Sequence, residues 1–325
     1  MAKKEIKTIG VLTSGGDAPG MNAAIRAVVR SALYKGMKVK GIKRGYAGLL
    51  QEEIIDMEAR HVSDTIQRGG TILQTARCME FMEEEGQKAG ADMCKKHGIE
   101  CLVVIGGDGS FRGAEALAQH GISVIGIPGT IDLDIGCTDY TIGFDTAVNT
   151  AMQAIDKVRD TSTSHERCSI IEVMGRHAGY IALNCGIANG AEDILVPEFY
   201  DYDEQKLVDN IIATRKRGKK HHIIINAEGI GNSIGMAKRI EAATGMETRA
   251  SILGHMQRGG SPTVKDRVTA TMMGCYAVDL VEQDKYNRLV IERSGVITDV
   301  DLAEGLATKK EVDAYQMEIC KRMSI

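Results

Sequence analysis

The sequence predicts an α/β fold with two lobes, each a mainly parallel β-sheet with helices on both faces. Short runs that are apolar along most of their length alternate with runs that have helical apolar spacing. The apolar runs lack the in-and-out alternation of a half-exposed sheet, which is typical of parallel strands buried on both faces. A chain of 325 residues with 43% hydrophobic content is long enough for two ordinary cores.

The individual elements follow this alternation from the N-terminus onward. Short apolar runs predict strands, and longer runs with apolar residues three or four apart predict helices. The expected order in the first half is strand 7–12, helix 21–34, strand 37–42, strand 101–105, helix 110–119, strand 122–127 and helix 143–160. The alternation resumes with the apolar runs 168–174, 178–188 and 193–197, a helix near 204–217, and the apolar runs 221–230 and 249–253.

The charge balance gives no reason to expect a nucleic-acid or membrane partner. The chain has 40 basic and 44 acidic residues and a formal net charge of -4, so any anion-binding site must be local. No apolar run approaches the roughly 20 residues of a membrane helix. The first residues, MAKKEIKTIGVLTSGG, move directly into strand-like sequence instead of a signal peptide. We therefore expect a cytoplasmic protein.

The eight cysteines are scattered singly along the chain and form no CxxC pair. Several lie inside apolar runs, which favours buried free thiols over a disulfide or zinc framework.

Glycine-rich turns follow two of the expected strands. The segments TSGGDAPGMN (13–22) and GGDGS (106–110) place glycines at the start of a helix, where exposed backbone N–H groups attract anions. Two such turns on one sheet favour a polyphosphate ligand, although each turn alone is also typical of an ordinary strand-to-helix connection. Asp108 would repel phosphate unless a divalent cation lay between them, which indicates a magnesium contact, direct or through water.

The type of phosphate site is narrowed by what the turns lack. The chain has no GxxxxGK[ST] loop, which excludes a Walker-type NTPase, and GGDGSFRG departs from the dinucleotide pattern GxGxxG. A third segment, PGTIDLDIGCTDYTIGFDTA (128–147), also follows a strand and carries Asp132 and Asp134 near Thr130. By spacing alone, these carboxylates are a base with a charge partner, a metal pair, or a solvated loop.

An ordered series of motifs resembles that of the bacterial ATP-dependent phosphofructokinase family. The motifs are GVLTSGGDAPGMNAAIR, RGGTIL, IGGDGS, PGTID, DYTIGFDTA, DTSTSHER, EVMGRHAGY, AEGI, TRASILGHMQRGGSP and DR, and they run from about residue 9 to 267. The resemblance implies transfer of phosphate from ATP, with Mg²⁺, to the 1-hydroxyl of fructose 6-phosphate. The products would be fructose 1,6-bisphosphate and ADP, in glycolysis.

The resemblance also assigns roles to residues. Asp132 would accept the proton of the sugar hydroxyl, Asp108 would contact magnesium, and Arg77 would span the phosphates. The catalytic positions are matched by Asp132, Thr130, Arg77 and Arg176. The ATP-binding positions are matched by Gly16, Arg77, Cys78, Gly107, Asp108, Gly109 and Ser110. The sugar-phosphate positions are matched by Thr130, Ile131, Asp132, Arg167, Met174, Gly175, Arg176, Glu228, Arg249, His255, Met256, Gln257 and Arg258.

Assembly and regulation are implied in the same way. The family forms homotetramers in which Arg167 and Arg249 would reach the active site of a neighbouring subunit, and members bind allosteric ADP or GDP, or phosphoenolpyruvate. The effector positions are matched by Arg26, Arg30, Arg159, Gly190, Ala191, Glu192, Arg217, Lys219, Lys220 and His221. The lobes would interleave, with residues 1–142 plus about 258–305 in the ATP-binding lobe and residues 143–257 plus about 306–325 in the sugar-phosphate lobe.

Three positions bear on donor choice and on activity. Pyrophosphate-dependent relatives typically have aspartate in place of Gly109 and lysine in place of Gly129, so the two glycines favour ATP over pyrophosphate. The usual family block is TIDND, and here Leu133 replaces the asparagine beside Asp132. That replacement is the reason to consider a non-catalytic, nucleotide-binding regulatory subunit as an alternative. A pyrophosphate-dependent phosphofructokinase is the other alternative.

Overall fold

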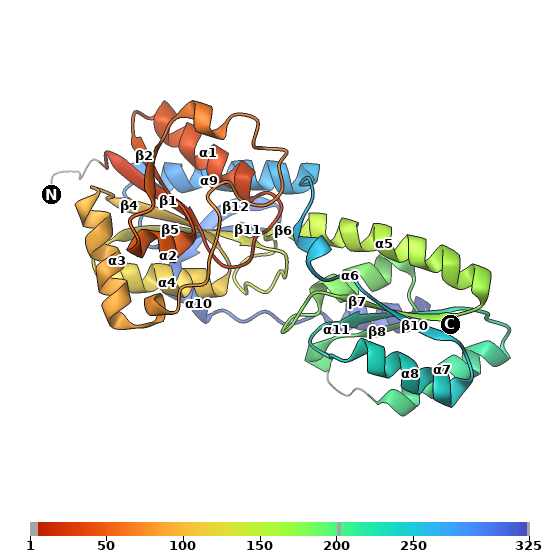
Figure 1. The fold of residues 1–325 in the computed structure, drawn as a ribbon. Helices are drawn as coiled ribbons and strands as arrows, with labels where there is room; N and C mark the ends of the chain where they lie inside the picture. The colour runs from red at the N-terminus through yellow and green to blue at the C-terminus, as the bar shows by residue number, and fades with distance from the viewer. Residues whose placement is uncertain (1–5, 200–202, 324–325) are drawn as a thin grey trace. The chain divides into compact units, whose positions relative to one another are not determined.

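The computed structural model describes residues 6–199 and 203–323. The chain divides into two compact units that each consist of two segments (Figure 1). Unit 1 comprises residues 1–146 and 258–310, and unit 2 comprises residues 147–257 and 311–325. The lobes expected from the sequence have their breaks at residues 142, 257 and 305.

Unit 1 is built on a large, mainly parallel sheet. Its strands run in the order β12-β11-β5-β4-β1-β2-β3, with β6 paired to β5 beyond this path. Strands β2, β1, β4, β5 and β11 are mutually parallel, and β3 and β12 are antiparallel edges. The strands of unit 1 are β1 (Thr8–Thr13), β2 (Lys38–Ile42), β3 (Ile54–Met57), β4 (Cys101–Gly106), β5 (Ser123–Thr130), β6 (Ile142–Gly143), β11 (Arg288–Arg293) and β12 (Val296–Asp301).

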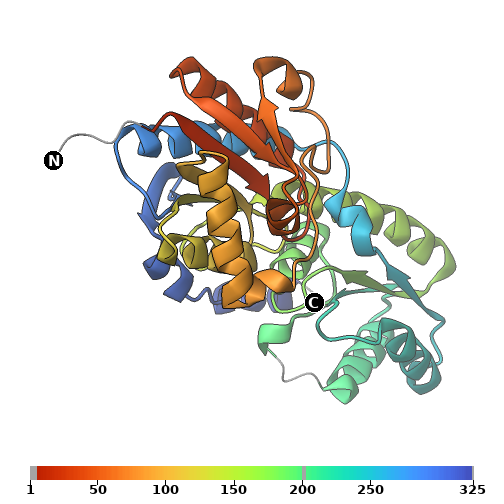
Figure 2. The same ribbon diagram turned by 60° about the vertical axis from the view of Figure 1, so that its left-hand side comes forward.

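Helices cover both faces of the unit 1 sheet (Figures 1 and 2). Helices α1 and α9 pack together on one face, and α2, α3, α4 and α10 lie on the other. Strands β1 and β4 are fully buried apart from the first residue of β1, as their unbroken apolar runs predict. The helices are α1 (Met21–Tyr34), α2 (Gly45–Leu50), α3 (Glu84–Lys96), α4 (Asp108–Gln119), α9 (Val264–Glu282) and α10 (Leu302–Ala307).

Unit 2 has a smaller sheet whose four strands are all parallel, in the order β10-β7-β9-β8. Helices α7 and α8 lie on one face, and α5, α6 and α11 on the other (Figure 1). The strands are β7 (Cys168–Val173), β8 (Asp193–Leu195), β9 (His222–Ala227) and β10 (Thr248–Ile252). The helices are α5 (Phe144–His165), whose first residues belong to unit 1, α6 (Tyr180–Asn189), α7 (Glu204–Lys216), α8 (Ser233–Thr244) and α11 (Ala314–Met323).

The predicted fold class is confirmed, and the differences are local. Helix α4 begins at Asp108, two residues before the expected start, because the carbonyl of Gly107 accepts the N–H groups of Ser110 and Phe111. The apolar run 178–188 forms helix α6. The antiparallel pair β11–β12 was not resolved by the sequence analysis.

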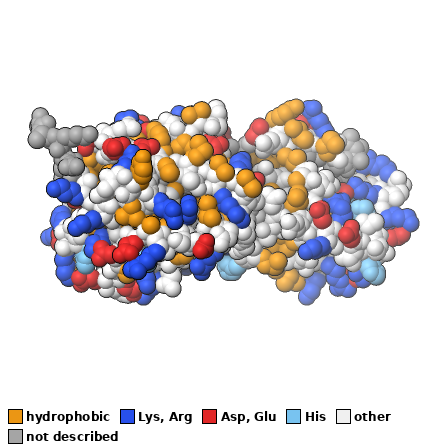
Figure 3. Space-filling model, turned by 90° about the horizontal axis from the view of Figure 1, so that it is seen from above, with side chains coloured by type: hydrophobic (Ala, Val, Ile, Leu, Met, Phe, Trp, Pro, Cys, Tyr) orange, Lys and Arg blue, Asp and Glu red, His pale blue; other side chains and the backbone are white. Residues whose placement is uncertain are grey.

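The state of the cysteines and the distribution of charged side chains can be compared with the expectations from composition. The cysteines whose side chains the structure describes are free, and five of the seven are buried; the side chain of Cys320 lies outside the described part. Acidic and basic side chains are interspersed on the face shown in Figure 3. Within residues 6–199 and 203–323, no helix combines the length and the apolar character needed to cross a bilayer.

Candidate active site

A pocket of about 620 Å³ lies within unit 1, where the chain reverses direction across the sheet. From β1 the chain first moves outward to β2, and later returns to the other side of β1 with β4. The connections that follow β1 and β4 therefore run to opposite faces of the sheet, through α1 and α4, and leave a crevice at the carboxyl ends of the two strands, which is where ligands bind in such sheets. The two glycine-rich turns of the sequence analysis both line this pocket, together with Thr130 and Asp132.

The glycines of these turns are required by the geometry. Gly15 has φ of 83°, in the left-handed region that favours glycine. A Cβ on Gly106 would lie 2.5 Å from the carbonyl oxygen of Ser14, so the first turn approaches the second too closely for any side chain there. Beyond Gly107, the first N–H groups of α4 have no partner within the helix. These groups can bind a phosphate, as the sequence predicted.

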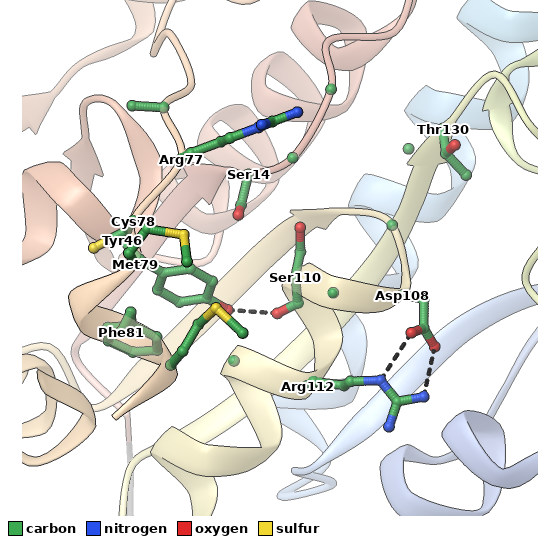
Figure 4. A pocket seen from close by; sticks show the side chains of 18 of the residues that line it. Ser14, Tyr46, Arg77, Cys78, Met79, Phe81, Asp108, Ser110, Arg112 and Thr130 are labelled. Carbon is green, nitrogen blue, oxygen red and sulfur yellow. Dashed lines mark hydrogen bonds and ion pairs between the residues drawn. The ribbon is translucent and has the colours of Figure 1, made fainter. Parts of the chain in front are cut away.

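The other end of the pocket is apolar. Tyr46 and Phe81 stack with ring centroids 4.1 Å apart and planes 13° from parallel (Figure 4). The Tyr46 hydroxyl donates to the carbonyl of Ser110 at 2.6 Å, which ties the aromatic pair to the phosphate turn. Met79 and Met82 line the same end and are 70% and 69% exposed. A pocket with flat, apolar walls at one end and N–H groups at the other suits a nucleotide.

The carboxylates of the pocket influence one another electrostatically. Burial raises the pKa of Asp134, and the negative charge of Asp132 acts in the same direction, with a smaller effect from Asp108. No group of three or more metal-ligating side chains is preassembled among the described residues. Magnesium typically takes one or two carboxylates together with substrate phosphates and water, so Asp108 at the phosphate end fits that pattern.

The loop that carries Asp132 has an unusual backbone. The Thr130 hydroxyl accepts the N–H of Asp132 at 3.2 Å, and the Thr130 carbonyl accepts the Thr141 hydroxyl at 2.7 Å. Leu133 has φ of 56°, a left-handed conformation that is costly for leucine and easier for asparagine. The asparagine of the family block therefore has a conformational reason to stand here, in addition to its hydrogen-bonding capacity.

Three arginines line the pocket: Arg77, Arg112 and Arg258. Of these, only Arg77 is predicted from the sequence to contact the nucleotide. Arg258, matched to the sugar phosphate, lies in unit 1 and donates to the carbonyl of Asp17 at 3.1 Å. Arg112 was missed, although it is paired with Asp108 in the structure (Figure 4). The signal was the i, i+4 spacing on one helix, which is visible only when the helix is started at residue 108.

Within unit 2, one group of predicted sugar-contacting residues gathers at the carboxyl ends of β7, β9 and β10. Met174 and Glu228 directly follow β7 and β9. Glycine is required at position 175 because φ is 130° there and because a Cβ would lie 2.2 Å from the carbonyl oxygen of Ala178. Gln257 is fully buried and accepts the N–H of Met174 at 3.2 Å, so its side chain holds the loop. The other members of this group are Arg176, His255 and Met256.

Arg167 and Arg249 lie at the opposite, amino ends of the same strands. Arg167 precedes β7, and Arg249 is the second residue of β10, level with Ser169. Glu247 bridges the two arginines, with carboxylate oxygens 2.7 Å from each. The hydrogen bond from Arg167 lowers the pKa of Glu247. Glu247 is not among the site residues predicted from the sequence, although its position two residues before Arg249 in extended chain places the two side chains on one face.

The predicted effector residues fall into both units. Arg26 and Arg30 lie on α1 in unit 1, and the others lie in unit 2. In unit 2, buried Glu192 pairs with Lys219 at 2.6 Å, and Arg159 donates to the carbonyl of Asn189 at 2.5 Å. Burial lowers the pKa of His221 beside them. The further effector positions in unit 2 are Gly190, Ala191, Arg217 and Lys220.

Comparison with known proteins covers almost the whole chain. Residues 8–281 match the family described as Phosphofructokinase. The chain is 57% identical over 322 residues to an ATP-dependent 6-phosphofructokinase of Thermoanaerobacter sp. (strain X514), covering 98% of this chain and 100% of that protein. It is 54% identical over 319 residues to the ATP-dependent 6-phosphofructokinase of Clostridium botulinum (strain Hall), again with 98% and 100% coverage.

Two solved phosphofructokinase structures from yeasts are similar in fold to this chain. Phosphofructokinase from Saccharomyces cerevisiae has a TM-score of 0.84 at 36% identity, over 92% of this chain and 45% of that one. Pichia pastoris phosphofructokinase in the T-state has a TM-score of 0.88 at 34% identity, over 99% of this chain and 39% of that one. The chain thus spans less than half of either yeast chain but the full length of its bacterial relatives. Because the family match and these identities extend over nearly all of its length, the chain belongs to the phosphofructokinase family.

Proposed function

We propose that the chain is an ATP-dependent 6-phosphofructokinase that phosphorylates the 1-hydroxyl of fructose 6-phosphate in glycolysis. One observation carries the proposal: Asp132 lines the same pocket as two glycine-rich turns and an aromatic, apolar end. Phosphoryl transfer needs this combination of a nucleotide site and a nearby base. The bacterial relatives that match over their full length bear the same activity in their names.

In the proposed reaction, the sugar's 1-oxygen attacks the γ-phosphorus of ATP. The new P–O bond forms while the bond to the β,γ-bridging oxygen breaks, so ADP leaves and the hydroxyl proton passes to Asp132. Arg77 neutralises negative charge on the phosphates of ATP, and Arg176 contacts fructose 6-phosphate. Mg²⁺ held by Asp108 and the phosphates would supply charge neutralisation of the triphosphate. A cytoplasmic location is part of this proposal.

Donor choice is supported by space at Gly109. A Cβ on Gly109 would meet nothing within 4 Å, so packing alone does not require glycine in this first turn of α4. A carboxylate at this position would add negative charge to the nucleotide pocket. At Gly129, by contrast, a Cβ would lie 3.1 Å from Ile105, so a lysine there needs repacking. Glycine at 109, which packing does not require, therefore supports ATP as the donor over pyrophosphate, whereas glycine at 129 also has a packing reason.

We also propose a homotetramer whose active sites are shared between subunits. Arg167 and Arg249 lie at one end of the unit 2 sheet and Met174 and Glu228 at the other, with the six residues of β7 between them, about 20 Å. One chain therefore does not bring all of its sugar-phosphate residues to one site, whereas two chains can.

An exposed apolar face supports the same assembly. Val264, Val268 and Met272 are 78%, 51% and 50% exposed, and their spacing places them on one face of α9. A second copy of the chain would remove this face from water.

The effector site belongs to this proposal as well. Lys219 pairs with buried Glu192 in unit 2, and the charges of Glu192, Arg159 and Lys219 all act on His221. Such a group of cations suits the phosphate of ADP, GDP or phosphoenolpyruvate once a ligand competes for them. The identity of the effector is open to direct measurement of initial rates with each compound.

The main test is a coupled assay of ADP release. We expect turnover with ATP, magnesium and fructose 6-phosphate, and little with pyrophosphate in place of ATP. Nucleotide binding without turnover would favour a regulatory subunit, and preference for pyrophosphate would favour the other donor. The variant Gly109→Asp serves as a matched probe, because it should weaken ATP use while leaving the fold intact.

Shared sites are tested by mixing two inactive variants. At a fructose 6-phosphate concentration well below the KM of Arg249→Ala, Asp132→Asn and Arg249→Ala are each expected to lose most activity as homo-oligomers. If one site takes Asp132 and Arg249 from different chains, random mixed oligomers contain intact sites and regain about a quarter of wild-type activity. Mixed oligomers that stay inactive would contradict sharing.

A further inference from the structure

Asp108 is already occupied by a cation of the chain itself. The Nε atom of Arg112 lies 2.8 Å from one carboxylate oxygen of Asp108, and its Nη2 atom lies 3.5 Å from the other (Figure 4). The two residues are one turn apart on α4, and both line the nucleotide pocket. The side chain of Arg112 is 62% exposed and that of Asp108 is 48% exposed, so little packing holds the guanidinium in place.

The position of this pair distinguishes it from an ordinary surface ion pair. Arg322 and Glu318 form a pair of the same i, i+4 spacing and similar exposure on α11, but they do not line the pocket. The pocket is lined by three carboxylates, and burial raises the pKa of one of them, Asp134. A carboxylate at the phosphate end repels a nucleotide that arrives without metal. Arg112 removes that repulsion at Asp108.

We propose that Arg112 and the metal ion compete for Asp108. This inference rests on the proposed function, in which Asp108 contacts Mg²⁺. In the absence of metal, Arg112 neutralises Asp108 and so permits a metal-free nucleotide to bind. When a divalent cation takes Asp108, the exposed guanidinium moves off at little cost, because solvent-exposed pairs are weak. Arg112 thereby sets the metal concentration at which the nucleotide site fills with metal.

The test measures metal and nucleotide binding separately in the full-length protein. Mn²⁺ binding to the protein–ADP complex is followed by loss of the electron paramagnetic resonance signal of free Mn²⁺. Binding of ADP with EDTA present is followed by calorimetry. For Arg112→Gln we expect Mn²⁺ to bind about two- to fivefold more tightly and metal-free ADP to bind more weakly by a similar factor. Arg112→Lys, which keeps the charge but loses the fork, should give intermediate values.

Arg322→Gln is the matched control, since it breaks an exposed i, i+4 pair outside the pocket. It should change neither binding constant. The competition is refuted if Arg112→Gln leaves the Mn²⁺ affinity unchanged or weakens it, with the variant's unfolding midpoint equal to that of the wild type. Failure of the proposed function would look different, because the wild-type chain would then show no turnover of ATP and fructose 6-phosphate, whatever its affinities for ADP and Mn²⁺.

Discussion

The nucleotide pocket and the sugar-phosphate residues differ in how much of a site one compact unit contains. The pocket collects its turns, aromatic end and carboxylates from segments of unit 1 alone. The sugar-phosphate residues of unit 2 are instead divided between the two ends of one sheet. A parallel sheet brings the carboxyl ends of its strands together, so residues that follow strands converge and residues that precede them lie on the far side.

The same contrast holds for how charges are satisfied. Asp108 and Arg112 form a pair by themselves, at the ligand end of the pocket. Arg167 and Arg249 share one carboxylate, Glu247, at the amino ends of β7 and β10, and none of the three lines the pocket of unit 1. If Asp108 holds a metal ion and the two arginines hold a phosphate, as proposed, then in each case a side chain of the protein takes the place of a ligand group with the same sign of charge. Under this proposal, ligand binding displaces an internal ion pair, and the variants below test each side of the comparison.

Asp132→Asn should have the largest effect, because it removes the proton acceptor from an otherwise complete pocket. We expect kcat to fall by about 10²–10⁴ and ADP affinity to stay within twofold of wild type. Steady-state kinetics and calorimetry measure the two quantities. Near-normal turnover in this variant would defeat the assignment of Asp132.

Arg249→Ala should impair the sugar-phosphate residues of unit 2 and leave the nucleotide pocket intact. Loss of one charged contact to a phosphate is expected to weaken fructose 6-phosphate binding by about 10- to 100-fold, while ATP binding stays nearly unchanged. Arg239→Ala, which removes an exposed arginine paired with Glu204 on the same unit, is the control and should change neither. A loss of ATP affinity equal to that of the sugar would mean that the two regions are not separable.

Leu133→Asn should have a smaller, stabilising effect. Asparagine adopts the left-handed conformation more readily than leucine, so the free energy of unfolding should rise by about 0.5–1 kcal/mol. Gln74, with φ of 60°, is a matched site outside the Asp132 loop, and Gln74→Asn should stabilise in the same way without changing kcat. Urea unfolding measures both. A lower unfolding midpoint in Leu133→Asn would show that its side-chain packing outweighs the backbone cost.

The pH dependence of the Glu247 bridge should be the smallest effect. The pKa of Glu247 is below its ordinary value of 4.5, chiefly through the hydrogen bond from Arg167, so the folded state binds this proton less readily than the unfolded chain. The bridge therefore stabilises above pH 4.5 and is lost as the pH falls through the lowered pKa. The difference in urea midpoint between wild type and Glu247→Gln should shrink in acid. A difference that grows in acid would reverse the sign of this interaction.

The fold class and the two glycine-rich turns can be predicted from local sequence signals. Apolar strands that alternate with helices leave parallel sheets covered on both faces as the consistent solution, and glycines next to helix starts mark where the backbone must be bare. These signals are local, since each depends on residues within a few positions of one another. The motif series then adds the proposed role of Asp132 as the base, for which spacing alone leaves three interpretations open.

Tertiary structure alone decided which residues meet. The pairing of β7 with β9 and β10 determines that Arg167 and Arg249 lie away from Met174 and Glu228. The re-entry of the chain into unit 1 at residue 258 places Arg258 at the nucleotide pocket. The pair of Asp108 and Arg112 depended on a helix start that the carbonyl of Gly107 fixes. Contacts of this kind depend on the order of strands far apart in the sequence and on the residue at which a helix begins. Neither can be predicted from the composition or the hydrophobic periodicity of a short segment.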